Sequence, residues 1–162
     1  MKLVCAHRIP RSADAFWSML HEDPYESRWA EAIGLRAYRE LERHEGPIEI
    51  YRRIQVEVAL PDALLSLIRR AGASGPPSYV EEQWRSRSER VVRWRITPNT
   101  FADRARASGI VRVEPRGPAS CERFLDGSIE VGVPIVGTLI ERMAVAMVVD
   151  SYEKGAKLAA RI

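Results

Sequence analysis

One amphipathic stretch at the end of the chain most limits the folds open to it. Residues 136–162 read as one long helix, because their apolar residues recur three or four positions apart along a single stripe. That stripe consists of Val136, Leu139, Ile140, Met143, Met147, Val148, Tyr152 and Leu158. Gly155 weakens the helix but need not end it. Any sheet in the chain must bury its apolar face, and no other helical stretch is large enough to cover one.

The rest of the chain reads as strands interrupted by short helices. A strand is predicted over 2–9, followed by short helices over 12–20 and 24–33, with Ser12 as an N-cap and Gly34 as a stop. A period of two then predicts strands over 35–45, 48–60, 79–88, 90–97, 103–115 and 120–131. We therefore predict an α+β fold, in which a curved antiparallel sheet of about seven strands wraps around the long C-terminal helix. Two short helices follow the first strand.

Composition favours one globular domain over residues 1–162, with 46% hydrophobic and 29% charged residues. No apolar run is long enough to span a bilayer, and the first residues do not resemble a signal peptide. The only two cysteines, Cys5 and Cys121, do not make a disulfide framework. Together these features predict a cytoplasmic protein.

Several stretches resemble a known superfamily. The segment IPRSADAFWSMLHEDPYESRW is similar to the opening of START-like (SRPBCC, helix-grip) proteins, and the matching residues are Pro10, Trp17, Asp23, Pro24 and Trp29. Within the superfamily the chain most resembles the bacterial DUF2505 family, with a fainter similarity to PRELI-like lipid carriers. The segments LPDALLSLI, RWRITPNTFADRARASGIVRVEP and LIERMAVAMVVDSYEKGAK carry this similarity.

The resemblance implies an internal cavity for a hydrophobic or amphipathic small molecule or lipid, which the protein would bind, carry or sense. The alternative is a small cyclase- or hydratase-like enzyme that uses the same cavity, and we favour binding over catalysis. In PRELI-like carriers a helical insertion forms a lid, which implies the same role for LPDALLSLIRR with Leu64, Leu65, Leu67 and Ile68. The other reading is an ordinary capping helix at the open end of the barrel.

Strand alternation places four charged residues on the face expected to be inside. Arg52 shares a face with Ile54 and Val56. The same reasoning points three more charged side chains inward, and these are Arg39, Glu82 and Arg123. Buried charges need partners, so a ligand carboxylate or phosphate is one interpretation. A β-bulge that turns some arginines to solvent, or side chains that reach solvent at the rim, is the other.

The remaining ligand contacts are predicted to be apolar. We expect the cavity between the sheet and the long helix to be lined by Ile54, Val56, Trp84, Trp94, Val111, Leu125, Met143 and Met147. Such aromatics equally suit an ordinary core. The apolar segment VGVPIVG beside the lid could form one exposed rim with it, flanked by Arg69 and Arg70, so transient contact with an anionic membrane is a further expectation. Burial of the two segments against each other, or a dimer contact, is the alternative.

The sequence holds no recognisable catalytic or metal constellation. Cys5, His7 and Cys121 fall short of a convincing ligand set, so no metal is expected, and no cofactor fingerprint is present. No nucleophile–base pairing is visible, although acid–base chemistry by Glu82 stays open. Nucleic acid is not expected as a partner, because the tryptophans Trp84 and Trp94 are predicted to lie on the apolar face, away from the arginines. The sequence leaves the oligomeric state open.

Overall fold

A computed structural model describes residues 1–162 as seven strands and four helices. The strands are β1 (Lys2–Ile9), β2 (Leu35–Glu45), β3 (Glu49–Val58), β4 (Ser78–Ser86), β5 (Val91–Pro98), β6 (Ala105–Pro115) and β7 (Cys121–Val131). The helices are α1 (Ala13–Met19), α2 (Tyr25–Ala32), α3 (Asp62–Arg70) and α4 (Gly137–Arg161). The predicted order of elements is confirmed.

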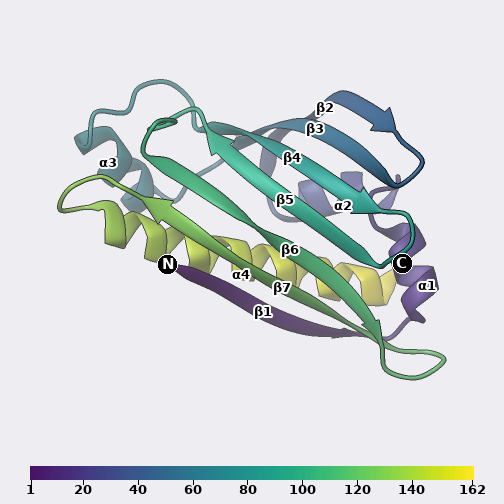
Figure 1. The fold of residues 1–162 in the computed structure, drawn as a ribbon. Coiled ribbons are helices and arrows are strands. Elements are labelled where there is room, and N and C mark those ends of the chain that lie inside the picture. Colours follow the sequence, from purple (N-terminus) through teal and green to yellow (C-terminus); the bar gives the residue numbers. More distant parts are fainter.

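All seven strands form one antiparallel sheet in the order β1-β7-β6-β5-β4-β3-β2. Figure 1 shows the sheet curving around α4, with α3 at one end of that helix and α1 and α2 at the other. The predicted curved sheet around a long C-terminal helix is therefore confirmed.

Local sequence signals set several boundaries where we expected them. The Ser12 hydroxyl caps α1 by accepting a hydrogen bond from the Ala15 amide at 3.2 Å. Gly34 ends the second short helix with a φ of +74°, a conformation that glycine adopts without steric cost. The prediction for the strand over 48–60 was too long at both ends. Ile48 lies in the turn before β3 and is 77% exposed, and Leu60 lies between β3 and α3.

The long helix covers the sheet unevenly. It packs mainly against β1 and β7, and α2 packs against its other side. One buried cluster, which includes Phe16, Tyr25 and Ala156, joins α1 and α2 to α4. A second cluster, which includes Leu125 and Trp94, lies under the sheet. The strands furthest from β1 arch away from α4, and the space between them becomes the site described next.

Candidate functional site

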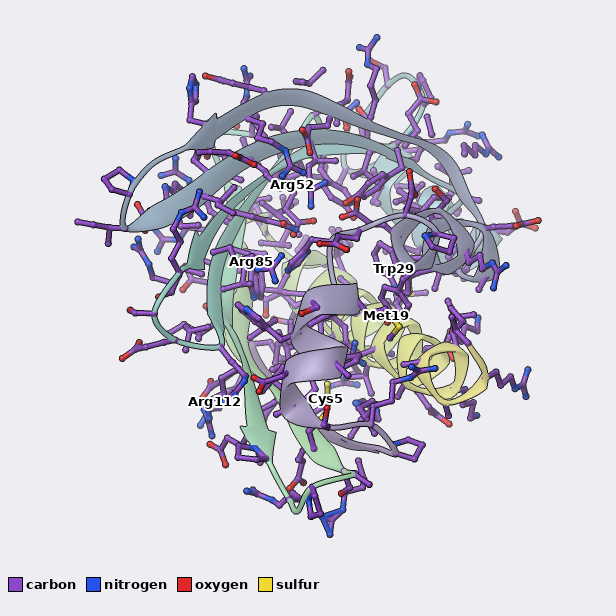
Figure 2. All side chains as sticks on the ribbon, turned by 90° about the vertical axis from the view of Figure 1, so that its right-hand side faces the viewer. Cys5, Met19, Trp29, Arg52, Arg85 and Arg112 are labelled. Carbon is purple, nitrogen blue, oxygen red and sulfur yellow. The ribbon has the colours of Figure 1, made fainter.

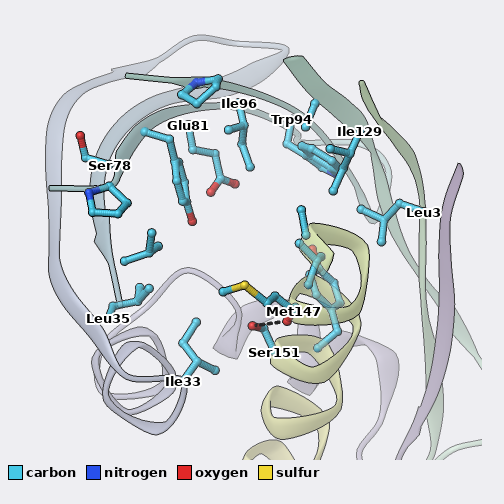
Figure 3. A pocket seen from close by; sticks show the side chains of 18 of the residues that line it. Leu3, Ile33, Leu35, Ser78, Glu81, Trp94, Ile96, Ile129, Met147 and Ser151 are labelled. Atoms are coloured by element: carbon cyan, nitrogen blue, oxygen red, sulfur yellow. Dashed lines mark hydrogen bonds between the residues drawn. The ribbon is translucent and has the colours of Figure 1, made fainter. Parts of the chain in front are cut away.

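A cavity of about 380 Å³ lies between the inner face of the sheet and α4. Figure 3 shows its sheet wall with Glu81, Ile96 and Trp94, and Met147 and Ser151 of α4 on the opposite side. Most of the lining side chains are hydrophobic. A concave, mainly apolar space with a few polar groups is the usual form of a small-molecule site.

Seven of the predicted site residues line this cavity. They are Leu64, Ile68, Trp94, Val111, Arg123, Leu125 and Met147. Ile54 and Val56 face inward as predicted but are fully buried, and they do not line the cavity. Met143 is half-buried on α4 and also lies outside the lining.

Two glycines give the Trp94 ring its place on the sheet wall. Gly109 and Gly127 are paired across β6 and β7, and the register places Trp94 opposite Gly109. A Cβ atom added at Gly109 would lie 2.8 Å from Trp94 Cζ2, and one added at Gly127 would lie 2.9 Å from it. The indole therefore lies against bare backbone, and its Nε1–H is buried without a hydrogen-bond partner.

The prediction that Arg39 faces the cavity opposite Arg52 is wrong. Arg39 is exposed, pairs with Gln55 across the strands, and donates to its side-chain oxygen at 3.0 Å. The register of β2 shifts at Leu35/Ala37 and again at Glu40/Glu42. Such bulges turn the following side chains to the other face, so Tyr38 lines the cavity instead.

Arg52 is buried as predicted, but its guanidinium already forms ion pairs with two carboxylates of the protein. Glu26 accepts from both terminal nitrogens of Arg52 at 2.7 and 3.0 Å, and Glu40 accepts from Nε at 2.6 Å. Burial alone would lower the pKa of Arg52, but these bonds outweigh it and raise that pKa. Figure 2 shows Arg52 on the inner side of the arch of strands. Since all three donor nitrogens are engaged, Arg52 is a structural anchor between α2 and the sheet.

Glu82 and Trp84 lie on the outer face of β4, against our prediction. Glu82 accepts hydrogen bonds from Arg95 at 2.6 and 2.9 Å and from the Tyr51 hydroxyl at 2.9 Å. The guanidinium groups of Arg93 and Arg95 lie over the Trp84 ring at 5.5 and 5.6 Å from its centroid. The expectation that this tryptophan lies away from the arginines is therefore also wrong.

The inner face of β4 holds the polar residues that the sequence reasoning missed. Tyr79, Glu81 and Gln83 line the cavity. The apolar Val80 and Trp84 instead predict that the opposite face of this strand points inward. The register with β3 was the available signal: Ile54 and Val56 face inward, and their partners across the sheet are Glu81 and Tyr79. Paired residues in a sheet share a face.

The side-chain carboxyl of Glu81 lies in a row of otherwise apolar side chains that runs across the strands of the sheet. Its neighbours across the sheet are Ile54 and Ile96, and the row continues through Ala107 and Ile129. Its one hydrogen bond within the protein is from Gln83 Nε2 to Oε1, at 2.7 Å. Burial raises the pKa of Glu81, and the Gln83 bond and the charge of Arg52 offset this only in part.

Arg123 is the cavity's unpaired cation. It is 4% exposed and donates to the Tyr152 carbonyl oxygen at 2.5 Å, and its Nε–H has no partner. Its guanidinium lies 4.5 Å from the centroid of the Tyr152 ring, a cation–π contact that offsets part of its desolvation. No carboxylate forms an ion pair with it, so an acceptor on a ligand would find a free donor there.

His21 lies on the cavity wall near the Glu26–Arg52 pair. Its side chain is 16% exposed, and its Nδ1 is 3.9 Å from Glu26 Oε1. Its Nε2 is buried without a partner. Burial lowers the pKa of His21 to about 3, and the positive charges of Arg85, Arg52 and Arg43 contribute. The imidazole is therefore neutral at physiological pH.

The short helix α3 stands beside the start of α4 (Figure 1). Leu64 is buried and Ile68 lines the cavity, while Leu65 and Leu67 are half-buried and do not line it. In the adjoining connection Ile135 is fully exposed, and Leu139 in the first turn of α4 is 44% exposed. An exposed apolar rim thus lies next to the helix predicted as a lid. None of the helices is long and apolar enough to cross a membrane.

Comparison with known proteins agrees with this architecture. The family described as "Protein of unknown function (DUF2505)" matches residues 5–162. No curated protein matches the chain. A crystal structure from Thermus thermophilus superposes with a TM-score of 0.71 at 13% identity, over 99% of this chain and 95% of that chain.

Two further structures have more informative descriptions. A START superfamily protein from Mycobacterium smegmatis gives a TM-score of 0.61 at 15% identity, over 98% of this chain and 94% of that one. The Zhui aromatase/cyclase of a Streptomyces species gives 0.66 at 14% identity, over 99% of this chain and 91% of that one. Identities this low show the fold alone, and they confirm the predicted START-like architecture.

Proposed function

The chain belongs to the DUF2505 family, and we propose that it binds an amphipathic small molecule or lipid in the cavity between the sheet and α4. The observation that carries the proposal is the combination of a mainly apolar cavity with charged side chains that the fold leaves without ion-pair partners. An apolar body would replace water against Trp94, Leu125 and Met147. A polar group on the same molecule would pair with a side chain such as Arg123.

Native mass spectrometry of freshly purified protein tests this proposal. We expect an added mass that dissociates on unfolding. Ala144 lines the cavity and Ala146 is exposed two residues further along the same helix, which makes them a matched pair. Ala144→Phe should fill the cavity and remove the added mass, whereas Ala146→Phe should keep it. Absence of any added mass, or equal retention in both variants, would count against a ligand in this cavity.

Acid–base catalysis in the same cavity is a second candidate, and Glu81 is the observation that favours it. The carboxyl is placed inside the cavity with a raised pKa, as a catalytic acid or base would need. Among the structural neighbours, the Streptomyces protein is described as an aromatase/cyclase. An enzyme would retain different molecules when active and inactive. A Glu81→Gln variant that co-purifies with a compound of different mass from the wild type would support catalysis, and identical compounds would support binding alone.

We also propose that α3 and the rim formed by Ile135 and Leu139 are the entrance for the ligand and a transient contact with anionic membranes. What supports this is the composition of the region. Fully exposed isoleucine is costly in water, and a membrane interface would accept it. Arg69 and Arg70 in the last turn of α3 are exposed and would be attracted to acidic headgroups.

A further inference from the structure

We propose that Glu81 recognises a hydrogen-bond donor on the ligand, a hydroxyl or a protonated amine, through the carboxyl oxygen that the protein leaves free. The inference rests on the proposed function and deepens it, because it names the polar group that the ligand of this cavity carries. It also explains why a carboxyl group stands at a position where an apolar residue would suit the fold.

The first support is the unfilled hydrogen-bonding capacity of the carboxyl. Gln83 donates to Oε1, and no other group of the protein donates to the side-chain carboxyl of Glu81. A carboxylate can accept several hydrogen bonds. Oε2 therefore remains an open acceptor inside a space large enough for a small molecule. Figure 3 shows the Glu81 carboxyl pointing from the sheet wall into that space.

The second support is that no cation of the protein is free to neutralise Glu81. The positive charge of Arg52 acts on Glu81 and lowers its pKa, but the donor nitrogens of Arg52 are already hydrogen-bonded to Glu26 and Glu40. The Glu81 row crosses β7 at Ile129, six positions along that strand from Arg123, and the Arg123 guanidinium donates to the Tyr152 carbonyl oxygen instead. No cation of the protein is therefore left to pair with Oε2, and a donor on the ligand would take that place.

The third support is the apolar setting of the carboxyl. Ile54, Ile96 and Ala107 continue its row across the sheet, and an apolar residue at position 81 would complete that row. Ser151 on the opposite wall uses its hydroxyl to donate to the Met147 carbonyl oxygen at 2.9 Å. A molecule between the two walls would thus meet Glu81 as an open acceptor among apolar neighbours. Its own donor would pair there while its body stays in apolar contact.

Three probes with one aromatic body test the inference. They are 2-naphthalenemethanol, 2-naphthalenemethylamine and the methyl ether of that alcohol, which has no donor. We expect wild-type protein to bind the alcohol and the amine about tenfold more tightly than the ether, because the ether leaves the carboxyl oxygen without a donor. Dissociation constants come from naphthalene fluorescence or calorimetry.

Variants at two adjacent glutamates separate recognition from stability. Glu81→Leu should abolish the preference for both donors, and the closely isosteric Glu81→Gln should abolish the preference for the amine while keeping part of that for the alcohol. Glu82→Gln changes the neighbouring carboxylate on the outer face and should leave all three affinities unchanged. Circular dichroism confirms that each variant is folded.

The outcomes also distinguish this inference from the proposed function. Equal binding of all three probes, unchanged by Glu81→Leu, would overturn the role of Glu81 and leave a ligand-binding cavity intact. No probe binding, with a co-purified molecule still present in native mass spectra, would likewise overturn only the role of Glu81. No probe binding and no co-purified molecule would overturn both.

Discussion

Glu81 and Glu82 are adjacent in β4 but face opposite sides of the sheet, and their surroundings shift their acidities in opposite directions. Burial raises the pKa of Glu81 inside the cavity. On the outer face, burial works to raise the pKa of Glu82 as well, but the hydrogen bonds from Arg95 and Tyr51 outweigh it and lower that pKa. The two glutamates therefore allow a matched comparison between a carboxyl group with few hydrogen-bond partners and one whose charge is paired with an arginine.

Replacing Glu81 with leucine should stabilise the fold. A carboxyl group with a raised pKa is harder to ionise in the folded chain than in the unfolded one, so it destabilises the fold once the pH exceeds its unfolded value. The free energy of unfolding should thus gain about 1 kcal/mol in Glu81→Leu at neutral pH. The gain should shrink as the pH falls toward 4.5, the ordinary value for this side chain.

Urea unfolding at acidic and neutral pH measures this difference, with Glu82→Leu as the control. The control should lose stability at neutral pH, and its loss should shrink on acidification, because the lowered pKa of Glu82 stabilises the fold only while the group is ionised. A Glu81→Leu variant less stable than wild type at neutral pH would show that the carboxyl supports the fold.

His21 should make the protein sensitive to acid. Its folded pKa of about 3 is below its ordinary value of 6.5, so between these values the unfolded chain binds the extra proton. Stability should therefore decrease as the pH falls from 6.5 toward 3. His21→Asn should flatten this decrease, and asparagine tolerates the φ of +72° at this position. Thermal unfolding at several pH values, with exposed His44→Asn as the control, would contradict the prediction if both variants kept the wild-type slope.

Arg123 should favour ligands that carry an acceptor or an acidic group. Arg123→Leu should weaken binding of a medium-chain fatty acid about tenfold or more, and should affect the methyl ester less, because charged hydrogen bonds in apolar surroundings are stronger than neutral ones. Arg39→Leu is the control, since Arg39 is exposed on the outer face. Calorimetric titration gives the affinities, and equal losses for acid and ester would assign Arg123 to packing with Tyr152 alone.

The exposed rim should bind anionic vesicles weakly and reversibly. Co-sedimentation with phosphatidylglycerol-containing liposomes should rise with anionic lipid content and fall with salt. Ile135→Ser with Leu139→Ser should reduce it several-fold. Ile48→Ser removes another strongly exposed isoleucine, in the β2–β3 turn, and should change nothing. Loss of binding in the control alone would place the membrane contact elsewhere.

The fold could be predicted from the sequence because its largest elements carry consistent patterns. The apolar stripe on the last helix and the alternation at Ile54 and Val56 each have one reading, and the resemblance covers nearly the whole chain. The site was harder because two local features break the rule that apolar side chains face inward. Bulges reverse the faces along β2, which misplaced Arg39. In β4 the cavity face is polar and the outer face holds Trp84 beneath arginines, which misplaced Glu82. Departures of this kind are expected at functional sites.

The contact of Trp94 with Gly109 and Gly127 has a consequence for how this cavity can diversify. Neither glycine lines the cavity, yet a side chain at either one would meet backbone of the facing strand as well as the indole. Even a substitution to alanine at either position would therefore clash with its neighbours. The Trp94 side chain, in contrast, only occupies space at the cavity wall. A smaller residue at this position would enlarge the cavity without disturbing the strands. In relatives that keep both glycines, the size of the cavity would then vary with the residue at position 94, while the backbone beneath it stays the same.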